Sequence, residues 1–348
     1  MPWLVYKSTD VGAPVLTGLD QVGRNMMKLL LTGPSGDGTG FAYGSMPCAG
    51  WSVAMSDSTK TVVRPGAVAR SRPYFRIWQP TGDAQCYVNG YSLMTDVDTG
   101  RDPFPATPSP PSQHVTIHGL LPNSATVNGT ARDWIVAADE RTFIYAVKNG
   151  STGWPASNGR WYVGYFGEFC SKVANDPNQA CIVAARHDYG QGYSPFGCYY
   201  QSQGVNASAF DARSGIYVMR NFDGGPDSVI GNWAFHMGVQ PKSANQYGGQ
   251  ICGIFPGTNP ADGKFWASHI PLCTYYKHPC VRGVLRGIWT SCANLDYYAD
   301  LSTLSMVTDD GVVNFLMLHT YGNTDGGEFG TTFHGNVLLQ IGGPVPYT

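Results

Sequence analysis

Glutamate is almost absent from this chain, and its scarcity limits how much exposed helix the chain can form. Only three of the 24 acidic residues are Glu, whereas the 348 residues include 44 Gly and 24 Pro. Glu is a good helix former, while Gly, Pro and Asp favour turns. We therefore predict a mainly β fold, β-sandwich-like, with long loops and one short helix near the N-terminus.

The rest of the composition is that of a folded chain with little net charge. Hydrophobic residues make up 43% of the chain, enough for the core of one large domain or two ordinary ones. The formal charge of −2 gives no basis for specific nucleic-acid binding, which needs clustered Lys and Arg. No apolar run approaches the ~18 residues of a membrane helix. The first residues also lack the features of a secretory signal, so we expect synthesis in the cytoplasm and no membrane insertion.

One helix is predicted over residues 20–31, with Asp20 as its N-cap and Gly33-Pro34 as its end. Its apolar face comprises Val22, Met26, Leu29 and Leu30, which recur at helical spacing. We expect this face to pack on the core. The nine cysteines are expected to be reduced and largely buried, because the chain is long and lacks the spacing of a secreted disulfide scaffold.

Most of the remaining chain reads as short strands separated by Gly, Pro and polar residues. The predicted strands are Trp3–Lys7, Trp51–Met55, Thr61–Arg64, Tyr74–Gln79, Gln85–Leu93, His114–His118, Asp133–Ala138, Thr142–Lys148, Trp161–Phe169, Ile216–Arg220, Asn232–Met237, Val281–Thr290, Val312–His319 and Asn336–Ile341. Residues 161–169 carry apolar groups on both faces, which predicts a strand covered on both sides or at a subunit interface. Residues 312–319 are nearly all apolar and are expected to be central. The Pro-rich residues 102–113 suit an exposed excursion or linker. We place a domain boundary near residue 200, giving domains 1–200 and 201–348, with one continuous domain as the alternative.

Two clusters contain residue types that bind metals. His269, Cys273, His278 and Cys280 are all zinc-competent. Their spacing matches no strong zinc-finger pattern, and a loop with buried thiols is the simpler interpretation. Asp96, Asp98 and Asp102 alternate as in a cation loop but lack the Gly and Glu of an EF-hand. We expect neither a bound metal nor a cofactor, with zinc and a cation site as the respective alternatives.

No catalytic group can be assigned from the sequence. Glu168 is the best single carboxylate because it ends the aromatic run from Trp161, but a glycosidase needs two facing carboxylates and no pair can be recognised. A carboxylate that accepts hydrogen bonds from a neighbouring turn is the simpler reading of Glu168. Six tryptophans are suited either to stacking on sugar rings or to packing in the core, namely Trp51, Trp154, Trp161, Trp233, Trp266 and Trp289.

Several segments, taken together and in order, resemble a family of structural proteins of tailed-bacteriophage virions. The segments are Val5–Gly18, Gly90–Gly100 with Pro103-Phe104-Pro105, Arg132–Arg141, Tyr165–Phe169, Asn259–Asp262, Arg282–Trp289 and Leu338–Pro344. They extend over nearly the whole chain and are weaker between about residues 190 and 255. In the family, the excursion after residue 102 lies inside one β domain, which argues against the linker interpretation.

The resemblance implies a place in the virion, most often in the tail region, and no catalytic residues. We therefore expect a non-enzymatic component of the tail or the head–tail junction. Its partners are expected to be other phage structural proteins, and copies of the chain are expected to form a symmetric homo-oligomer. The alternative is a receptor- or glycan-binding tip for host attachment, or a capsid decoration module.

Overall fold

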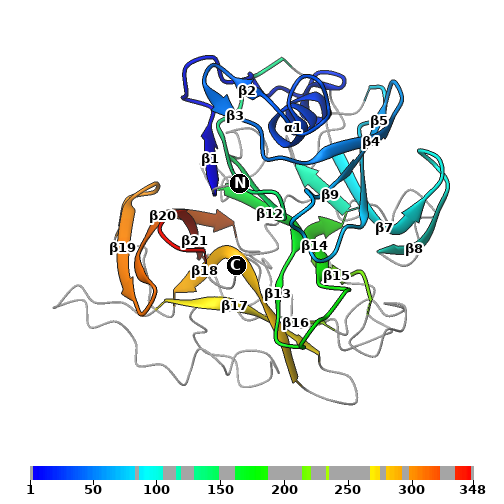
Figure 1. The fold of residues 1–348 in the computed structure, drawn as a ribbon. Coiled ribbons are helices and arrows are strands. Elements are labelled where there is room, and N and C mark those ends of the chain that lie inside the picture. The colour runs from blue at the N-terminus through cyan, green and yellow to red at the C-terminus, as the bar shows by residue number, and fades with distance from the viewer. Residues whose placement is uncertain are drawn as a thin grey trace, which may run out of the picture.

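The computed structural model shows a mainly β molecule with one helix near its N-terminus (Figure 1). It describes residues 3–82, 86–104, 115–118, 129–148, 161–186, 214–220, 233–234, 267–274, 280–291, 298–321 and 334–345. In chain order the elements are β1 (Leu4–Lys7), α1 (Val22–Thr32), β2 (Phe41–Tyr43), β3 (Met46–Pro47), β4 (Ser52–Ser56), β5 (Lys60–Arg64), β6 (Tyr74–Trp78), β7 (Cys86–Met94), β8 (Gly100–Phe104), β9 (Val115–His118), β10 (Trp134–Ala138), β11 (Thr142–Lys148), β12 (Trp161–Glu168), β13 (Cys170–Ser171), β14 (Ala180–Arg186), β15 (Ser214–Val218), β16 (Trp233–Ala234), β17 (Ala267–Thr274), β18 (Cys280–Ser291), β19 (Thr303–Thr308), β20 (Gly311–Tyr321) and β21 (His334–Gly342). The predicted mainly β fold is confirmed.

The strands form three antiparallel ladders that are joined by further hydrogen bonds. The N-terminal ladder is β4–β5–β6–β7–β8, the central ladder is β1–β10–β11–β12–β14–β15, and the C-terminal ladder is β19–β20–β21–β18–β17. In Figure 1 strands β12 and β14 of the central ladder, in green, lie between the blue and cyan N-terminal ladder and the yellow to red C-terminal ladder.

Further pairings connect the ladders. β9 pairs with both β7 and β14, β13 pairs with β18, and β12 runs parallel to β20 where Trp161 meets Thr320. Hydrogen bonds therefore cross the boundary expected near residue 200. The division into residues 1–200 and 201–348 stays a prediction.

Strand β12 is covered on both sides, as its sequence predicted. Tyr162 and Phe166 belong to a core cluster that includes α1 and the N-terminal ladder. Trp161, Val163 and Tyr165 belong to a second cluster, formed with the C-terminal ladder. Every residue of β12 is buried, because alternate side chains point to opposite faces and each face has its own cover.

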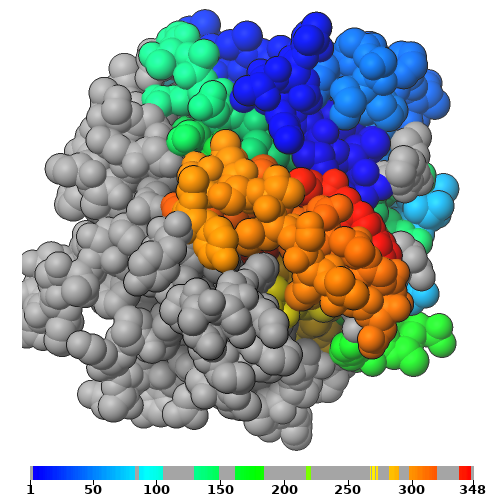
Figure 2. All heavy atoms as spheres, turned by 90° about the vertical axis from the view of Figure 1, so that its left-hand side faces the viewer, coloured from blue at the N-terminus to red at the C-terminus, as the bar shows by residue number. Residues whose placement is uncertain are grey.

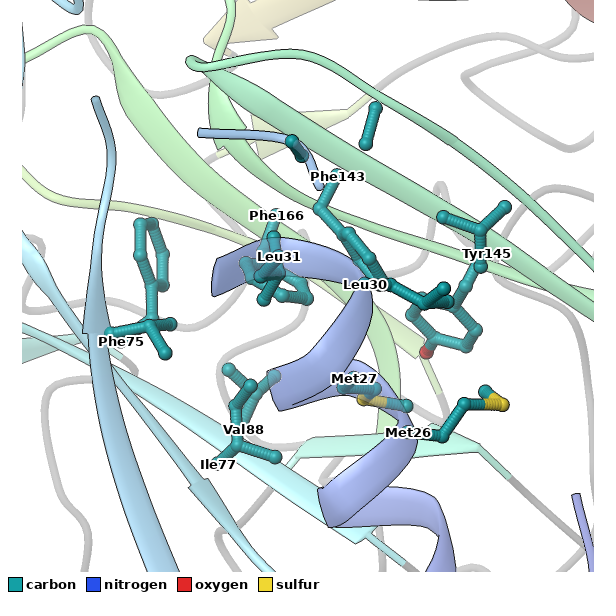
Figure 3. Packing of buried hydrophobic residues seen from close by; sticks show 14 of the residues in the cluster. Met26, Met27, Leu30, Leu31, Phe75, Ile77, Val88, Phe143, Tyr145 and Phe166 are labelled. Carbon is teal, nitrogen blue, oxygen red and sulfur yellow. The ribbon is translucent and has the colours of Figure 1, made fainter. Parts of the chain in front are cut away.

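Helix α1 packs on the core through one side. Its buried apolar residues are Met26, Met27, Leu30 and Leu31, a stripe rotated slightly from the predicted one, in which Val22 and Leu29 are only partly buried. Figure 3 shows these residues beside Phe143, Tyr145 and Phe166 of the central ladder and Phe75, Ile77 and Val88 of the N-terminal ladder. The helix therefore fills the space between two ladders.

Only the C-terminal end of α1 agrees with the prediction from the sequence. The helix begins after Gln21, which has a left-handed φ of 64° and makes no side-chain cap. The predicted N-cap, Asp20, instead accepts a hydrogen bond from the backbone of Gly82 at 2.8 Å, so that prediction is wrong. Gly33 ends the helix as predicted, with φ 70° and its N–H bonded to Leu29 O. A Cβ at Gly33 would lie 2.4 Å from Thr39 O, so only Gly fits.

The strands that the sequence did not predict are β2, β3, β8, β13, β14, β17 and β19. Asp102–Phe104 belongs to β8, which pairs with β7, so the predicted excursion begins later; residues 105–113 lie outside the described part. Strand β14 was not predicted, although it is apolar. Strand β17 lies where a loop was expected. The apolar strand β20 is central, as predicted, because it pairs with β19 on one side and β21 on the other.

Candidate functional site

Glu168, the carboxylate for which the sequence most suggested chemistry, is buried at the end of β12. It is 1% exposed. Its Oε1 accepts a hydrogen bond from the backbone N–H of Ser71, and Arg141 Nε lies 3.9 Å from Oε2. Burial raises the pKa of Glu168, while Ser71, Gln179 and Arg141 partly oppose that rise. The carboxylate thus fastens the loop of residues 65–73 to the end of β12, as a buried acceptor does.

Arg286, on β18, holds Asp139 through two hydrogen bonds. Nη1 donates to Oδ1 at 3.2 Å and Nη2 donates to Oδ2 at 2.8 Å, and Nη1 also donates to Thr142 Oγ1 at 3.0 Å. Burial lowers the pKa of Arg286, but the charge and hydrogen bonds of Asp139 outweigh it, so the pKa is raised overall. This bidentate geometry is the strong form of an Arg–carboxylate contact. It joins β18 to the turn between β10 and β11.

Arg282, four residues earlier on β18, also makes a bidentate contact, with Asp176. Its Nε and Nη2 lie 3.0 and 2.9 Å from Asp176 Oδ2, and Nη2 also donates to Asn178 O at 3.0 Å. Arg282 Nη1 donates to Arg220 O, and the guanidinium lies 5.2 Å from the centre of the Phe169 ring. This pair joins β18 to the segment that follows β13.

These two pairs lie near Glu168, whose carboxylate is influenced by the charge of Arg286. We name the set Asp139, Glu168, Asp176, Arg282 and Arg286 the buried ionic network. All five are 7% exposed or less. A general acid or base must come within hydrogen-bond reach of a substrate, whereas each carboxylate here is covered and already bonded to protein donors. The arrangement is suited to holding strands together.

Sequence reasoning found Glu168 but did not single out the other four members of this network. A usable signal was present in β18, where Arg282 and Arg286 interrupt an otherwise apolar strand at a spacing of four. Residues spaced by four lie on one face of a strand, and a buried charge requires a partner of opposite sign. The identity of the partners, Asp139 and Asp176, depends on contacts more than 100 residues apart along the chain.

The alternating aspartates of the possible cation loop are engaged with the protein itself. Asp98 lies 2.6 Å from Lys60 Nζ and 3.2 Å from Arg76 Nη1. Asp102 accepts hydrogen bonds from Ser92 and Arg220, and Asp96 accepts one from the backbone N–H of Asp98. Carboxylates that bind cationic side chains and the backbone of their own turn are typical of an ordinary Asp-rich turn.

The possible zinc ligands are spread along a hairpin rather than gathered in a loop. His269 and Cys273 lie on β17, Cys280 begins β18 opposite Thr274, and His278 lies outside the described residues. Thr274 lies five residues after His269 along β17, about 16 Å at ~3.3 Å per residue. Zinc bonds are about 2.0–2.3 Å long, so His269 and Cys280 are too far apart to bind one ion.

His269 has a different environment from that of a metal ligand. Its ring stacks on Trp289, with 3.6 Å between centroids. Burial, with a smaller contribution from Lys172, lowers the pKa of His269 to about 4, so the ring is neutral at pH 7. Within the described part of the chain, no group of three or more His, Cys, Asp and Glu side chains is arranged to hold a metal ion.

Three of the six tryptophans considered for sugar stacking are core residues. Trp51, Trp161 and Trp289 are 0%, 1% and 5% exposed. The indole N–H of Trp51 donates to Asp139 O, and that of Trp161 donates to Asp300. These rings cannot lie against a sugar. The side chains of Trp154, Trp233 and Trp266 lie outside the described residues.

The described cysteines agree with the predicted buried thiols. Cys48, Cys86, Cys170 and Cys181 are buried and form no disulfide. Burial raises the pKa of Cys170 to about 11, so its thiol stays protonated at neutral pH. A protonated, buried thiol behaves as a small hydrophobic group.

No protein-family model matches the sequence, and no curated protein matches it significantly. Among the described residues, no helix combines the length and apolar character needed to cross a membrane.

Proposed function

We propose that this chain is a structural component of the virion of a tailed bacteriophage, placed in the tail or at the head–tail junction. It acts by packing against several other virion proteins and carries out no reaction. The observation that carries the proposal is a contrast between the interior and the surface of the β scaffold. Inside, buried charged side chains pair with one another and join strands. On the surface, large apolar side chains are exposed. The four most exposed of these are Val11, Val15, Phe41 and Val307, at 95%, 64%, 58% and 82%.

The exposed N-terminal residues are held on a fixed framework. Tyr43 Oη donates a hydrogen bond of 2.7 Å to Asp10 Oδ2, which joins the β2–β3 hairpin to the loop after β1. Val11 and Phe41 are therefore presented from two connected segments. Apolar side chains on such a surface favour contact with another protein, and little conformational entropy is lost because their backbone is already ordered.

The place in a virion rests on the ordered resemblance of segments along the chain to phage tail-region proteins. A particle component needs shape-specific surfaces and a backbone that does not deform under repeated contacts. The doubly covered central ladder and the buried ionic network are properties of that kind of protein.

The test is made on phage particles and on the variants Val11→Asp and Phe41→Asp. Mass spectrometry of purified particles is expected to find the chain, and electron microscopy of the purified protein is expected to show rings or other repeated copies. Each variant should fold, because both side chains are exposed, but should be incorporated several-fold less because the new charge must be desolvated at a protein contact.

Glu168→Gln serves as the matched control for chemistry. An amide oxygen can still accept the hydrogen bond from Ser71, so assembly should be unchanged. Absence of the chain from mature particles would contradict the proposal. So would cleavage of a polysaccharide by the purified protein that Glu168→Gln abolished. Binding on a glycan array that a Trp→Ala change removed, without incorporation defects, would support the attachment alternative instead.

A further inference from the structure

The hairpin of β19 and β20 carries an uncovered tip that combines apolar and acidic groups. Val307 and Val312 are cross-strand partners and are 82% and 52% exposed. Asp309 and Asp310 form the exposed turn between them, and neither makes an ion pair with a described residue. We name these four residues the β19–β20 tip. Figure 2 shows the C-terminal hairpin region, in orange, at the surface of the molecule.

The tip is closed by a hydrogen bond across its turn, and the other face of the hairpin packs on the protein. Thr308 Oγ1 donates to Gly311 O at 2.8 Å across the turn. Leu304 and Met306, whose side chains alternate with the exposed Val307, pack against the third core cluster. Among the described residues β19 pairs with β20 alone. The outer face of the tip is thus an ordered surface that nothing in the described chain covers.

A second surface, formed by the loop of residues 65–73, has the opposite charge. Val68 is 49% exposed, and Arg70 and Arg72 are also exposed. We name these three residues the arginine loop. Arg70 makes no ion pair with a described residue. Arg72 uses its Nε to donate to Pro65 O at 3.1 Å, which leaves its outer guanidinium nitrogens available.

The arginine loop is fastened to the protein from beneath. Ser71, between the two arginines, donates its N–H to Glu168 and its Oγ to Pro177 O at 2.6 Å. Gly66 N donates to Glu140 O at 2.7 Å. The positions of the two guanidinium groups are therefore largely set before any partner arrives, and such preorganisation lowers the entropic cost of binding.

The two surfaces belong to different parts of the chain. The tip lies on β19 and β20 of the C-terminal ladder, and the arginine loop lies between β5 and β6 of the N-terminal ladder. Among the described residues, no hydrogen bond or ion pair joins the two surfaces within one chain. The inferred contact is therefore one between two molecules.

We infer that the β19–β20 tip of one copy docks on the arginine loop of the next copy. The tip supplies two carboxylates and two valines, and the arginine loop supplies two guanidinium groups and one valine. In the complex, pairs of opposite charge would surround an apolar contact. Charge complementarity of this kind gives a contact its specificity. The contact is head-to-tail, and repeated head-to-tail contacts close into a ring or extend as a filament. The inference deepens the proposed function, on which it rests, by naming a second copy of the chain as one partner.

The experiment measures self-association of the purified chain by light scattering and sedimentation over a range of salt concentrations. The wild-type chain is expected to associate, and association should weaken as salt rises. Asp309→Lys with Asp310→Lys, and separately Arg70→Glu with Arg72→Glu, should each weaken association by roughly tenfold or more, because like charges then face each other. The variant with all four changes should associate again, since both surfaces have exchanged sign.

Asp133→Lys is the control, because it reverses one exposed charge outside both surfaces and should leave association unchanged. Circular dichroism and melting curves confirm that each variant is folded. A wild-type chain that stays monomeric at every concentration and salt overturns the inference, and so does a fourfold variant that fails to regain association. Either result leaves the proposed function standing if the chain is found in phage particles. Self-association of a chain that is absent from particles overturns the proposed function alone.

Discussion

At the scale of single residues, Arg282 and Arg286 place two permanent positive charges inside the protein. A guanidinium cannot lose its proton in a protein, so burial must be compensated by a carboxylate with good geometry. Asp176 and Asp139 supply that compensation through bidentate contacts. Such pairs add little net stability compared with a packed apolar core, but removal of one partner leaves the other charge buried and alone.

Arg286→Met is therefore expected to destabilise the fold by about 3–5 kcal/mol, because Asp139 loses its cation in a buried site. Urea unfolding followed by circular dichroism measures this loss. The control is Lys148→Met, which removes a partly exposed partner of Asp300 and should cost less than about 1 kcal/mol. Equal effects of the two substitutions would show that the Arg286 pair is not the structural contact described above.

At the scale of elements, the sequence predicted most described strands because apolar and polar residues alternate in them. It also predicted the double coverage of β12 and the central place of β20. It missed β17, because the Cys- and His-containing residues from His269 to Cys280 were interpreted as a loop with buried thiols. It also assigned Asp20 as the N-cap of α1. In the structure the Asp20 carboxylate instead accepts a hydrogen bond from the backbone N–H of Gly82, which lies in a distant turn. The carboxylate partners of Arg282 and Arg286 could not be predicted either, because each lies more than 100 residues away along the chain.

A substitution at Gly90, on β7, would test how closely β7 and β8 pack. The ring of Phe104 on β8 lies directly over it, and a Cβ at Gly90 would come 2.0 Å from Phe104 Cζ. Gly90→Ala should destabilise the protein by about 1–3 kcal/mol through overpacking, measured as a fall in the urea midpoint. Gly129→Ala, where a Cβ meets nothing within 4 Å, should have little effect. Phe104→Leu should recover part of the loss in Gly90→Ala; no recovery would place the strain elsewhere.

At the scale of the whole molecule, the central ladder is shared by two cores. One cluster joins it to α1 and the N-terminal ladder, and the other joins it to the C-terminal ladder. Residues on both sides of position 200 are needed to cover its second face. The ladder thus connects the two halves of the chain through packing as well as through hydrogen bonds.

A fragment of residues 1–200 is therefore expected to fold poorly alone, because Ile135, Ile144 and Val163 lose their cover and face water. Solubility, binding of a hydrophobic dye and proton NMR dispersion would measure this. Coexpression with residues 201–348 should restore a soluble complex. A fragment that is soluble and well dispersed by itself would support two independent domains.

The burial of β12 on both faces also bears on which changes of length the chain can accept. A shift of β12 by one residue against β11 would turn every side chain of the strand to the opposite face. Trp161, Val163 and Tyr165 would then point into the first core cluster, and Tyr162 and Phe166 would point into the second. An insertion or deletion inside residues 161–168 would thus disturb both sides of the molecule in a single step. Over evolutionary time, drift in length should accumulate in the connecting segments, while this strand keeps a constant count of residues.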